Sequence, residues 1–272
     1  MNDLPKIFRL DDRVAVVTGG AGLLGAEFCQ TLAGAGARVV VADINLVAAT
    51  ALAKTLTQKG LEALGVGVDV TVPISVHQMV KTVMEACGRL DILVNSAALD
   101  PKFDPRHSEH GNSFEDYPLE AWNQALAVNL TGMFLCCQAA VQPMIAQGGG
   151  VIINLSSIYG LTAPDQRLYQ REGQPLQYKP AYYPVTKSAV LGFTSYLAAY
   201  YGDKKIRVNT LSPGGVYNGH DAEFVQSYSA RTMLGRMAQK DDMNGALLFL
   251  ASDASAYMTG GNLVVDGGWS AW

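Results

Sequence analysis

The sequence contains few charged residues and no cluster of basic ones. Only 16% of its 272 residues are charged, and 20 Lys and Arg against 24 Asp and Glu give a net charge of −4. Binding to nucleic acid through phosphate contacts requires clustered Lys and Arg, so we expect no nucleic-acid partner. Apolar residues make up 49% of the chain, which is enough for a large buried core. A small molecule is the expected partner.

Long apolar runs and cysteine motifs are also absent. The chain has no run of roughly 18 apolar residues that would span a bilayer, and the opening segment MNDLPKIFRLDDR contains no secretory signal. We therefore expect a cytoplasmic protein with no membrane partner. Cys29, Cys87, Cys136 and Cys137 lack the spacing of metal ligands. We interpret them as small buried hydrophobic residues and expect no metal site.

Short β-branched segments alternate with helical ones along the chain. RVAVVTGG and ARVVVAD flank a helix rich in small residues, and the segments EALGVGVDV, LDILVNSAA, GVIINLSS, KIRVNTLSP and NLVVDGG follow. Continuous apolar strands separated by amphipathic helices predict a parallel sheet covered on both faces. The length of 272 residues fits one such domain.

A long connection, residues 158–181, separates GVIINLSS from the next helix, and a loop of this length in a compact domain is usually functional. Cationic side chains occur in this connection, in an earlier polar loop and near residue 220: Arg167, Arg171, Lys179, Arg106, His107, His110 and His220. They would suit an anionic or polyhydroxylated substrate. Acidic residues lie among them, namely Asp104, Glu109, Asp165 and Glu172. A merely solvated loop is an equally good interpretation.

The segment TGGAGLLG, from Thr18 to Gly25, lies where the first strand turns into the first helix. A glycine-rich turn at this point lets the backbone approach a pyrophosphate, whose charge is favoured by the free N–H groups at the helix N-terminus. On its own the motif is equally compatible with an ordinary tight turn between a strand and a helix.

Asp43 ends the second strand, about 20 residues beyond this loop, where a carboxylate can accept both hydroxyls of an adenosine ribose. A 2′-phosphate would meet a negative charge there, and Ile44 and Asn45 supply no compensating cation. The pattern favours NAD over NADP, with a helix cap as the alternative role of Asp43. Asp69 ends the third strand and either approaches the adenine or caps a helix.

Tyr183 and Lys187 are four residues apart, so they lie on the same face of a helix. Tyr182 has a threonine at the matching position and lacks such a partner. A tyrosine that acts as a base near neutral pH needs its pKa lowered by about two to three units, each worth about 1.36 kcal/mol. The nearby ammonium of Lys187 favours the phenolate and so lowers this pKa. Pro184 is typical of a first helical turn, which places Tyr183 near the positive end of the helix, and this also lowers the pKa.

Taken together, these features resemble the short-chain dehydrogenase/reductase family. The segments that carry the resemblance occur in the family's order from about residue 13 to the C-terminus: TGGAGLLG, Asp43, LVNSAA, VNL, INLSS, YPVTK, SPGG and VDGG. Each motif is weak alone, whereas the combination is specific.

Three features depart from the family's pattern. The usual T-G-x-x-x-G-x-G loop has a glycine where this chain has Leu23, and Gly22 matches the T-G-x-x-G-x-x-G spacing of the longer branch instead. The Asn-Asn-Ala-Gly segment reads NSAA, so only Asn95 carries over directly. The interval between Ser157 and Tyr183 exceeds the usual one, so residues 158–181 are an insertion beside the active site.

The resemblance implies a single doubly wound, Rossmann-like α/β domain over residues 1–272, with a seven-stranded parallel sheet and helices on both faces. It implies a homo-oligomer, either a dimer or a tetramer. The activity it implies is hydride transfer between NAD(H) and a secondary alcohol or ketone. Residues 216–235, bracketed by glycines, would then form a mobile lid over the substrate.

The family's site residues transfer to matching positions in this chain. Tyr183 is the implied proton acceptor, Lys187 lowers its pKa and holds the nicotinamide ribose, Ser157 bonds the reacting oxygen, and Asn129 holds a water in the proton path. Ser156 is interpreted as structural. The implied cofactor-binding residues are Gly19, Gly22, Leu23, Leu24, Gly25, Asp43, Asp69, Val70, Asn95, Ala97, Tyr183, Lys187, Pro213, Gly214 and Val216.

The inserted LYQREGQP segment and the VDGGWSAW ending are similar to family members associated with bacterial surface sugars, including sialic-acid-like sugars. A sugar or sugar-derived substrate is therefore expected. Two alternatives remain open at the level of sequence. One is an epimerase or dehydratase that recycles NAD within a turnover, and the other is a dinucleotide-sensing module without catalysis.

Overall fold

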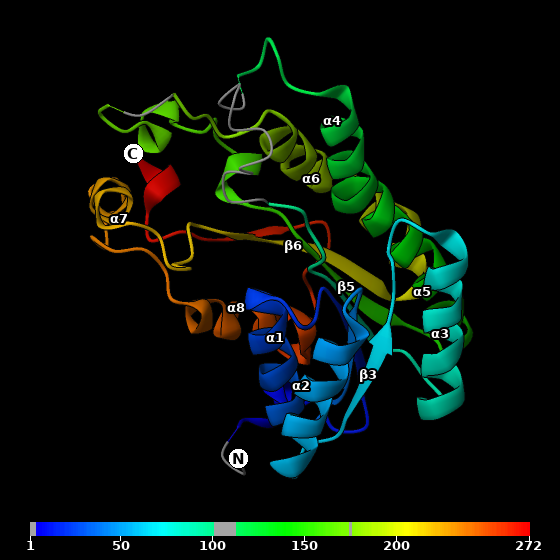
Figure 1. The fold of residues 1–272 in the computed structure, drawn as a ribbon. Helices are drawn as coiled ribbons and strands as arrows, with labels where there is room; N and C mark the ends of the chain where they lie inside the picture. The colour runs from blue at the N-terminus through cyan, green and yellow to red at the C-terminus, as the bar shows by residue number, and fades with distance from the viewer. Residues whose placement is uncertain (1–3, 101–112, 174–175) are drawn as a thin grey trace.

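The computed structural model describes residues 4–100, 113–173 and 176–272. Parallel strands form one seven-stranded sheet in the order β3-β2-β1-β4-β5-β6-β7 (Figure 1). The strands are β1 (Val14–Thr18), β2 (Arg38–Asp43), β3 (Ala63–Gly67), β4 (Ile92–Asn95), β5 (Gly150–Leu155), β6 (Ile206–Pro213) and β7 (Asn262–Val265). The predicted seven-stranded parallel sheet is confirmed.

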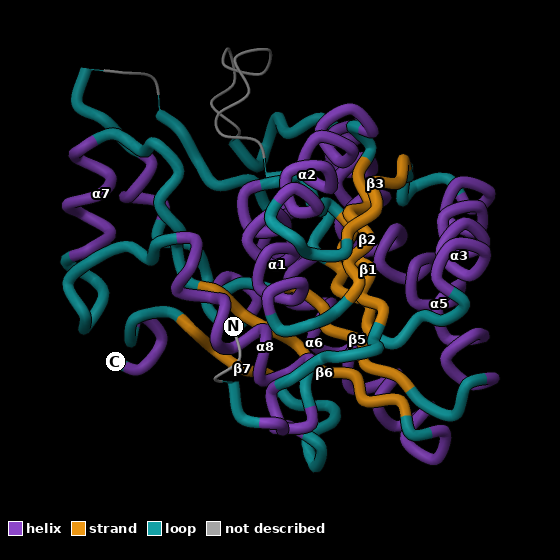
Figure 2. Tube along the Cα trace, turned by 90° about the horizontal axis from the view of Figure 1, so that it is seen from below, coloured by secondary structure: helices purple, strands orange, loops and turns teal. Residues whose placement is uncertain are grey.

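Helices cover both faces of this sheet, and Figure 2 shows α1 and α2 on the opposite side from α3 and α5. One layer consists of α1 (Leu23–Gly34), α2 (Leu46–Gln58) and α8 (Asn244–Ala251). The other consists of α3 (Pro73–Cys87), α5 (Met133–Ala146) and α6 (Tyr182–Tyr201). Every residue of β1 is buried, which explains why its first four residues are all apolar instead of alternating with polar ones.

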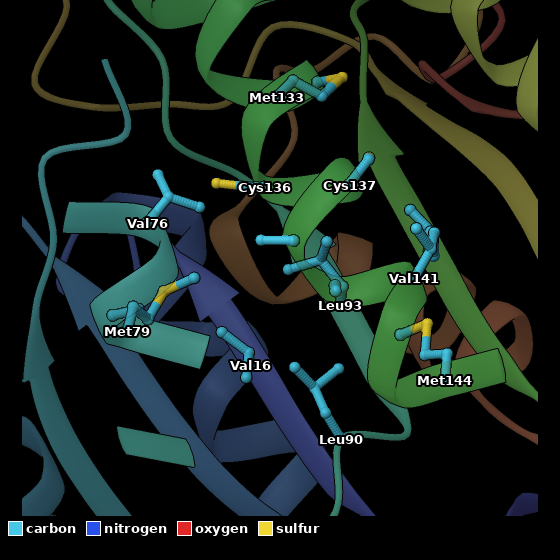
Figure 3. Close-up of a cluster of buried hydrophobic side chains, with 14 of the residues drawn as sticks. Val16, Val76, Met79, Leu90, Leu93, Met133, Cys136, Cys137, Val141 and Met144 are labelled. Carbon is cyan, nitrogen blue, oxygen red and sulfur yellow. The ribbon is translucent and has the colours of Figure 1, made fainter. Parts of the chain in front are cut away.

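The core between the sheet and the layer of α3 and α5 is drawn in Figure 3, and it contains Val16 of β1, Met79 of α3 and Met144 of α5. Cys136 and Cys137 lie in this core, and burial raises the pKa of the Cys136 thiol to about 12. Cys29 is buried in the opposite layer. The expected burial is confirmed for these three cysteines, whereas Cys87 is only half-buried because it lies at the end of α3.

A continuous helical stretch, Leu119–Ala146, comprises α4 (Leu119–Leu126), the π-helical turn η3 (Ala127–Gly132) and α5. Its length and its mean hydropathy of 1.4 would be enough to cross a bilayer. Half of its most apolar part is buried inside the molecule, as is typical of the core helix of a globular protein. The absence of a membrane partner therefore stays a prediction.

Parallel strands bring their carboxyl ends to the same edge of the sheet. Thr18 at the end of β1 is level with Asn95 at the end of β4, and Asn95 is level with Asn154 of β5. The chain runs outward from β1 to β2 on one side and continues from β4 on the other. Ligands of open α/β sheets bind at such a reversal of strand order, so the site is expected at this edge.

Candidate active site

A cavity of about 860 Å³ lies at the carboxyl edge of the sheet. It extends from the glycine loop after β1 to the segment after β6, and includes residues of the insertion. The predicted site residues that line it are Gly19, Gly22, Leu23, Leu24, Gly25, Asp43, Asp69, Val70, Ala97, Ser157, Tyr183, Lys187, Pro213, Gly214 and Val216. Among the described residues, no group of three His, Cys, Asp or Glu side chains is arranged to hold a metal ion.

The glycine loop leaves no room for side chains at two positions. A Cβ added to Gly25 would lie 2.1 Å from the carbonyl oxygen of Gly19, and Gly19 itself has a φ of 62°. Gly22 is the N-cap of α1, and Leu23 is the first helical residue. The first N–H groups of a helix have no acceptor within it. Those of Leu23 and its neighbours border the cavity and fit the pyrophosphate of a dinucleotide.

Asp43 is held at the end of β2 by two backbone N–H groups. Its carboxylate accepts hydrogen bonds from Ala21 at 3.0 Å and from Asn45 at 2.9 Å. The N-cap of α2 is Asn45, whose side chain accepts from Ala48. Asp43 is therefore not the cap of α2, and its fixed carboxylate borders the cavity at the position expected for ribose binding.

Asp69 has a local structural role in addition to its place in the cavity wall. Its carboxylate accepts hydrogen bonds from the backbone N–H and the hydroxyl of Thr71, at 2.9 and 2.6 Å. The N-cap of α3 is Val72, so Asp69 stabilises the turn that precedes this helix. Asp69 is therefore not the N-cap of α3, and its contact with the adenine stays a prediction.

Asn95 and Asn129 lie beside the cavity and do not line it. The Asn95 side chain donates to Asn154 at 2.9 Å, which links β4 to β5 inside the core. Its Oδ1 is buried and has no hydrogen-bond partner among the described residues. Asn129 accepts from the N–H of Leu99 at 2.6 Å and donates to its carbonyl at 3.1 Å. Asn129 therefore fixes the backbone of Leu99 beside the cavity, whereas Asn95 links two strands in the core.

Tyr183 and Lys187 meet in the first turns of α6, as the sequence predicts. The Lys187 ammonium lies 5.8 Å from the centroid of the Tyr183 ring and donates a hydrogen bond to the carbonyl of Leu155 at 2.8 Å. Lys187 is 4% exposed, and burial lowers its pKa to about 8. Its charge is therefore held against the end of β5.

The sequence predicts a lowered pKa for Tyr183, whereas its surroundings in the structure raise this pKa. Burial raises the pKa of its hydroxyl, the nearby Asp100 carboxylate raises it further, and a hydrogen bond with Ser157 lowers it only in part. The sequence shows the spacing of Tyr183 and Lys187, but not the desolvation that outweighs the ammonium. The phenol is thus held in its protonated form.

The two adjacent serines at the end of β5 have different partners. Ser156 donates to the carbonyl of Lys187 at 2.7 Å, which ties β5 to α6. Ser157 accepts from the N–H of Tyr159 at 3.2 Å and interacts with Tyr183. The structural reading of Ser156 and the placement of Ser157 beside the tyrosine agree with the sequence analysis.

The sequence analysis named Lys179 as a candidate substrate contact but missed Asp100 and the aromatic residues of the cavity wall. Lys179 lies over the Tyr183 ring, 4.1 Å from its centroid, and forms an ion pair with Asp100. Aromatic residues of the cavity wall come from the insertion and the lid: Tyr159, Tyr169, Phe224 and Tyr228. Asp100 is a polar residue soon after the end of β4, a position that could have identified it.

The segment predicted as a lid contains α7 (Ala222–Ser229) and packs against the insertion. Tyr169 and Phe224 form a ring contact with centroids 5.7 Å apart. Trp269 stacks on Tyr228 at 4.3 Å, and Figure 1 shows the C-terminus beside α7. The loop residues Asp104, Arg106, His107, Glu109 and His110 lie outside the described residues.

Comparison with known proteins gives consistent results. A family model described as "Enoyl-(Acyl carrier protein) reductase" matches residues 20–270. D-threitol dehydrogenase of Mycolicibacterium smegmatis is 37% identical over 97% of this chain and 95% of its own length. A short-chain type dehydrogenase/reductase from Mycobacterium marinum is 32% identical, with a TM-score of 0.84 over 97% of both chains.

Another solved structure, gluconate 5-dehydrogenase from Burkholderia cenocepacia in complex with NADP and tartrate, is 32% identical, with a TM-score of 0.86 over 98% of both chains. The match over nearly the whole chain, the fold and the cavity agree with one another. A dehydrogenase of this fold binds a nicotinamide dinucleotide. The chain therefore belongs to the short-chain dehydrogenase/reductase family and is an enzyme of that class.

Proposed function

We propose that this enzyme transfers a hydride between NAD(H) and a secondary alcohol or ketone on a sugar, a polyol or a related compound. The observation that carries the proposal is one cavity that is lined both by the glycine loop and Asp43 and by Ser157, Tyr183 and Lys187. When bound, the nicotinamide accepts or returns the hydride. The chain's own residues bind the dinucleotide, orient the substrate and move the proton.

Ser157 and Tyr183 would both contact the reacting oxygen of the substrate. The Ser157 hydroxyl orients this oxygen, and the Tyr183 hydroxyl exchanges a proton with it. Because burial raises the pKa of Tyr183, the tyrosine is protonated at neutral pH and suited to donate a proton to a ketone oxygen. Alcohol oxidation needs the deprotonated phenol, so it should gain most from alkaline pH. Lys187 supplies the neighbouring positive charge, and Asn129 fixes the adjacent backbone.

The proposed cofactor is NAD, although the gluconate 5-dehydrogenase relative binds NADP. The argument is the carboxylate of Asp43, held in the cavity wall by Ala21 and Asn45. A 2′-phosphate would bring like charges together there, and Ile44 and Asn45 carry no positive charge.

The proposed substrate class is supported by relatives named for threitol and gluconate, both polyhydroxylated compounds. The likeness to proteins of bacterial surface-sugar pathways, including sialic-acid-like sugars, remains part of this proposal. We also propose a cytoplasmic homo-oligomer, a dimer or a tetramer, which light scattering of the purified protein would test. A monomer at micromolar concentration would contradict it.

Absorbance of reduced nicotinamide tests the activity directly. The purified enzyme is mixed with NAD and a panel of polyols, sugars and simple secondary alcohols, and with NADH and the matching ketones. Tyr183→Phe should lower kcat by at least about 100-fold, a typical contribution of a positioned acid or base. Turnover that survives this change would contradict the assignment, and a tightly retained cofactor without net NADH production would indicate internal recycling instead.

Tyr182→Phe is the matched control for this experiment. The Tyr182 ring is 1% exposed, and its hydroxyl is buried without a hydrogen-bond partner among the described residues. The hydroxyl does not border the cavity, so its removal should leave turnover within about twofold and stability equal or slightly higher.

A further inference from the structure

The insertion fixes the backbone of Lys179 at the substrate end of the cavity. The side chain of Gln166 accepts a hydrogen bond from the Lys179 N–H at 2.8 Å and donates one to the Lys179 carbonyl at 3.3 Å. Gln166 belongs to the short helix η5 (Gln166–Tyr169), which is capped by Asp165. An amide that bonds both backbone groups of one residue holds that residue in place, so the insertion presents Lys179 to the cavity.

The side chain of Lys179 is held between two groups. Its ammonium lies on the face of the Tyr183 ring, 4.1 Å from the centroid, and forms an ion pair with Asp100. The Lys179 side chain is 13% exposed, whereas that of Asp100 is 43% exposed. Both residues border the cavity. The pair therefore lies against the ring of the tyrosine that exchanges the proton, and its carboxylate is the more exposed partner.

A paired ammonium and carboxylate offer a donor and an acceptor without a net charge. A substrate hydroxyl can accept from the ammonium and donate to the carboxylate at the same time. A substrate carboxylate can only accept, and it would be repelled by Asp100. A simple alcohol with no second hydroxyl would leave the pair without any partner in the substrate.

Building on the proposed function, we propose that Asp100 and Lys179 bind a hydroxyl group on the carbon next to the reacting one. The ion pair would then select uncharged vicinal diols and polyols over simple alcohols and over hydroxy acids. A site built to hydrogen-bond a substrate hydroxyl discriminates strongly against analogues that lack it, because its polar groups lose their partner. Asp100 and Lys179 are in this view the residues that determine specificity.

Three matched probes test the proposal with the full-length enzyme and NAD: cyclohexanol, 1,2-cyclohexanediol and 2-hydroxycyclohexanecarboxylate. They differ only in the group next to the reacting carbon. The unmutated enzyme should have a kcat/KM for the diol at least about 10-fold above that for either other probe. Lys179→Met should lower the ratio of diol to cyclohexanol by at least about 10-fold, mainly through a higher KM for the diol.

Asp100→Asn gives the sharper result because it releases the Lys179 ammonium from its carboxylate. We expect the ratio of hydroxy acid to diol to rise by at least about 10-fold in this variant, since a free ammonium attracts the substrate carboxylate. Lys179→Met should not raise this ratio. Loss of a purely structural contact would change both variants in the same direction. Lys204→Met is the control, because this exposed lysine pairs with its neighbour Asp203, and it should leave all three values unchanged.

The outcomes separate the two proposals. Turnover of the probes without a preference for the diol would overturn the role of Asp100 and Lys179 and leave the dehydrogenase proposal intact. A rise of the hydroxy-acid ratio in both variants would also overturn it. An enzyme that oxidises no secondary alcohol with NAD or NADP would refute the proposed function, and the inference with it. Melting temperatures of all variants confirm that the folded protein is measured.

Discussion

The guanidinium of Arg171, in the insertion, lies 2.9 Å from the carboxylate of Asp221, which caps helix α7. A second ion pair joins Asp165 of the insertion to Arg231, beyond the other end of α7, at 2.7 Å. The insertion is thus tied to the predicted lid on both sides of this helix. The two segments, far apart in sequence, should close over the substrate as one unit.

Arg171→Ala should weaken this connection and raise the KM for the substrate several-fold with a smaller change in kcat. The Arg171 side chain is 18% exposed and its partner Asp221 is 58% exposed, so water partly screens this ion pair and the effect should be moderate. Hydrogen exchange in residues 216–235 should accelerate, while the melting temperature changes little. Arg167→Ala is the control, because Arg167 is 80% exposed and pairs with Asp165 of the insertion itself. Equal effects of the two variants would contradict the connection.

Asp43 should determine the choice of cofactor. We expect the unmutated enzyme to bind NAD at least about 10-fold more tightly than NADP, a difference of about 1.4 kcal/mol. Asp43→Ala should reduce this ratio by removing the charge that opposes a 2′-phosphate. Direct titration of both dinucleotides measures the effect, with Asp203→Ala, an exposed acid paired with Lys204, as the control. Equal affinities of NAD and NADP for the unmutated protein would disprove the preference.

Lys187 should reduce stability at neutral pH while serving the reaction. Burial lowers its pKa to about 8 from 10.5, so the unfolded chain binds the proton more tightly than the folded one. A shift of this size corresponds to roughly 3 kcal/mol of cost for the folded state below pH 8. Lys187→Met should therefore raise the melting temperature at pH 7 and abolish turnover.

The lowered pKa of Lys187 also determines how the stability of the folded protein changes with pH. Between pH 8 and 10.5 the folded lysine loses its proton and the unfolded one keeps it, so the unmutated protein gains stability relative to Lys187→Met. Denaturant unfolding at pH 7 and pH 9.5 measures the difference. A stability gap that is constant over this range, or one that favours the lysine at pH 7, would show that burial does not destabilise its charge.

Gly25→Ala should disrupt the glycine loop, because the added Cβ would lie 2.1 Å from the Gly19 carbonyl oxygen. Backbone has to move, so we expect loss of dinucleotide binding by at least about 10-fold and a destabilisation of about 1–3 kcal/mol. Gly245→Ala in α8 is the control, since its Cβ would meet nothing within 4 Å and alanine favours a helix. Titration of NAD and thermal unfolding measure both changes. Normal cofactor affinity of Gly25→Ala would contradict the role of this close contact.

The parts of the site that could be predicted from sequence depend on local spacing. Tyr183 and Lys187 are one helical turn apart, and the glycine loop and Asp43 end adjacent parallel strands, so pattern alone brings them to one edge. The contact of Lys179 with Asp100 joins residues 79 positions apart and depends on the path of the insertion. No periodicity in the sequence specifies that path.

The protonation of the tyrosine was predicted in the wrong direction for a related reason. The spacing of Tyr183 and Lys187 indicates an attraction between them, whereas desolvation depends on everything that packs around the ring, including Tyr159 and Asp100. The π-helical turn η3 is equally invisible in sequence, because LEAWNQALAVNLTGMFL reads as an uninterrupted helix.

That turn has a consequence for which substrate is accepted. The wider helical turn places Asn129 where it bonds both backbone groups of Leu99, the residue immediately before Asp100. Deleting one residue from 127–132 would restore ordinary α-helical geometry and rotate Asn129 away from the backbone of Leu99. The backbone next to Asp100 would then no longer be held in place. A change in helical geometry could therefore alter substrate selectivity without replacing any residue that contacts the substrate.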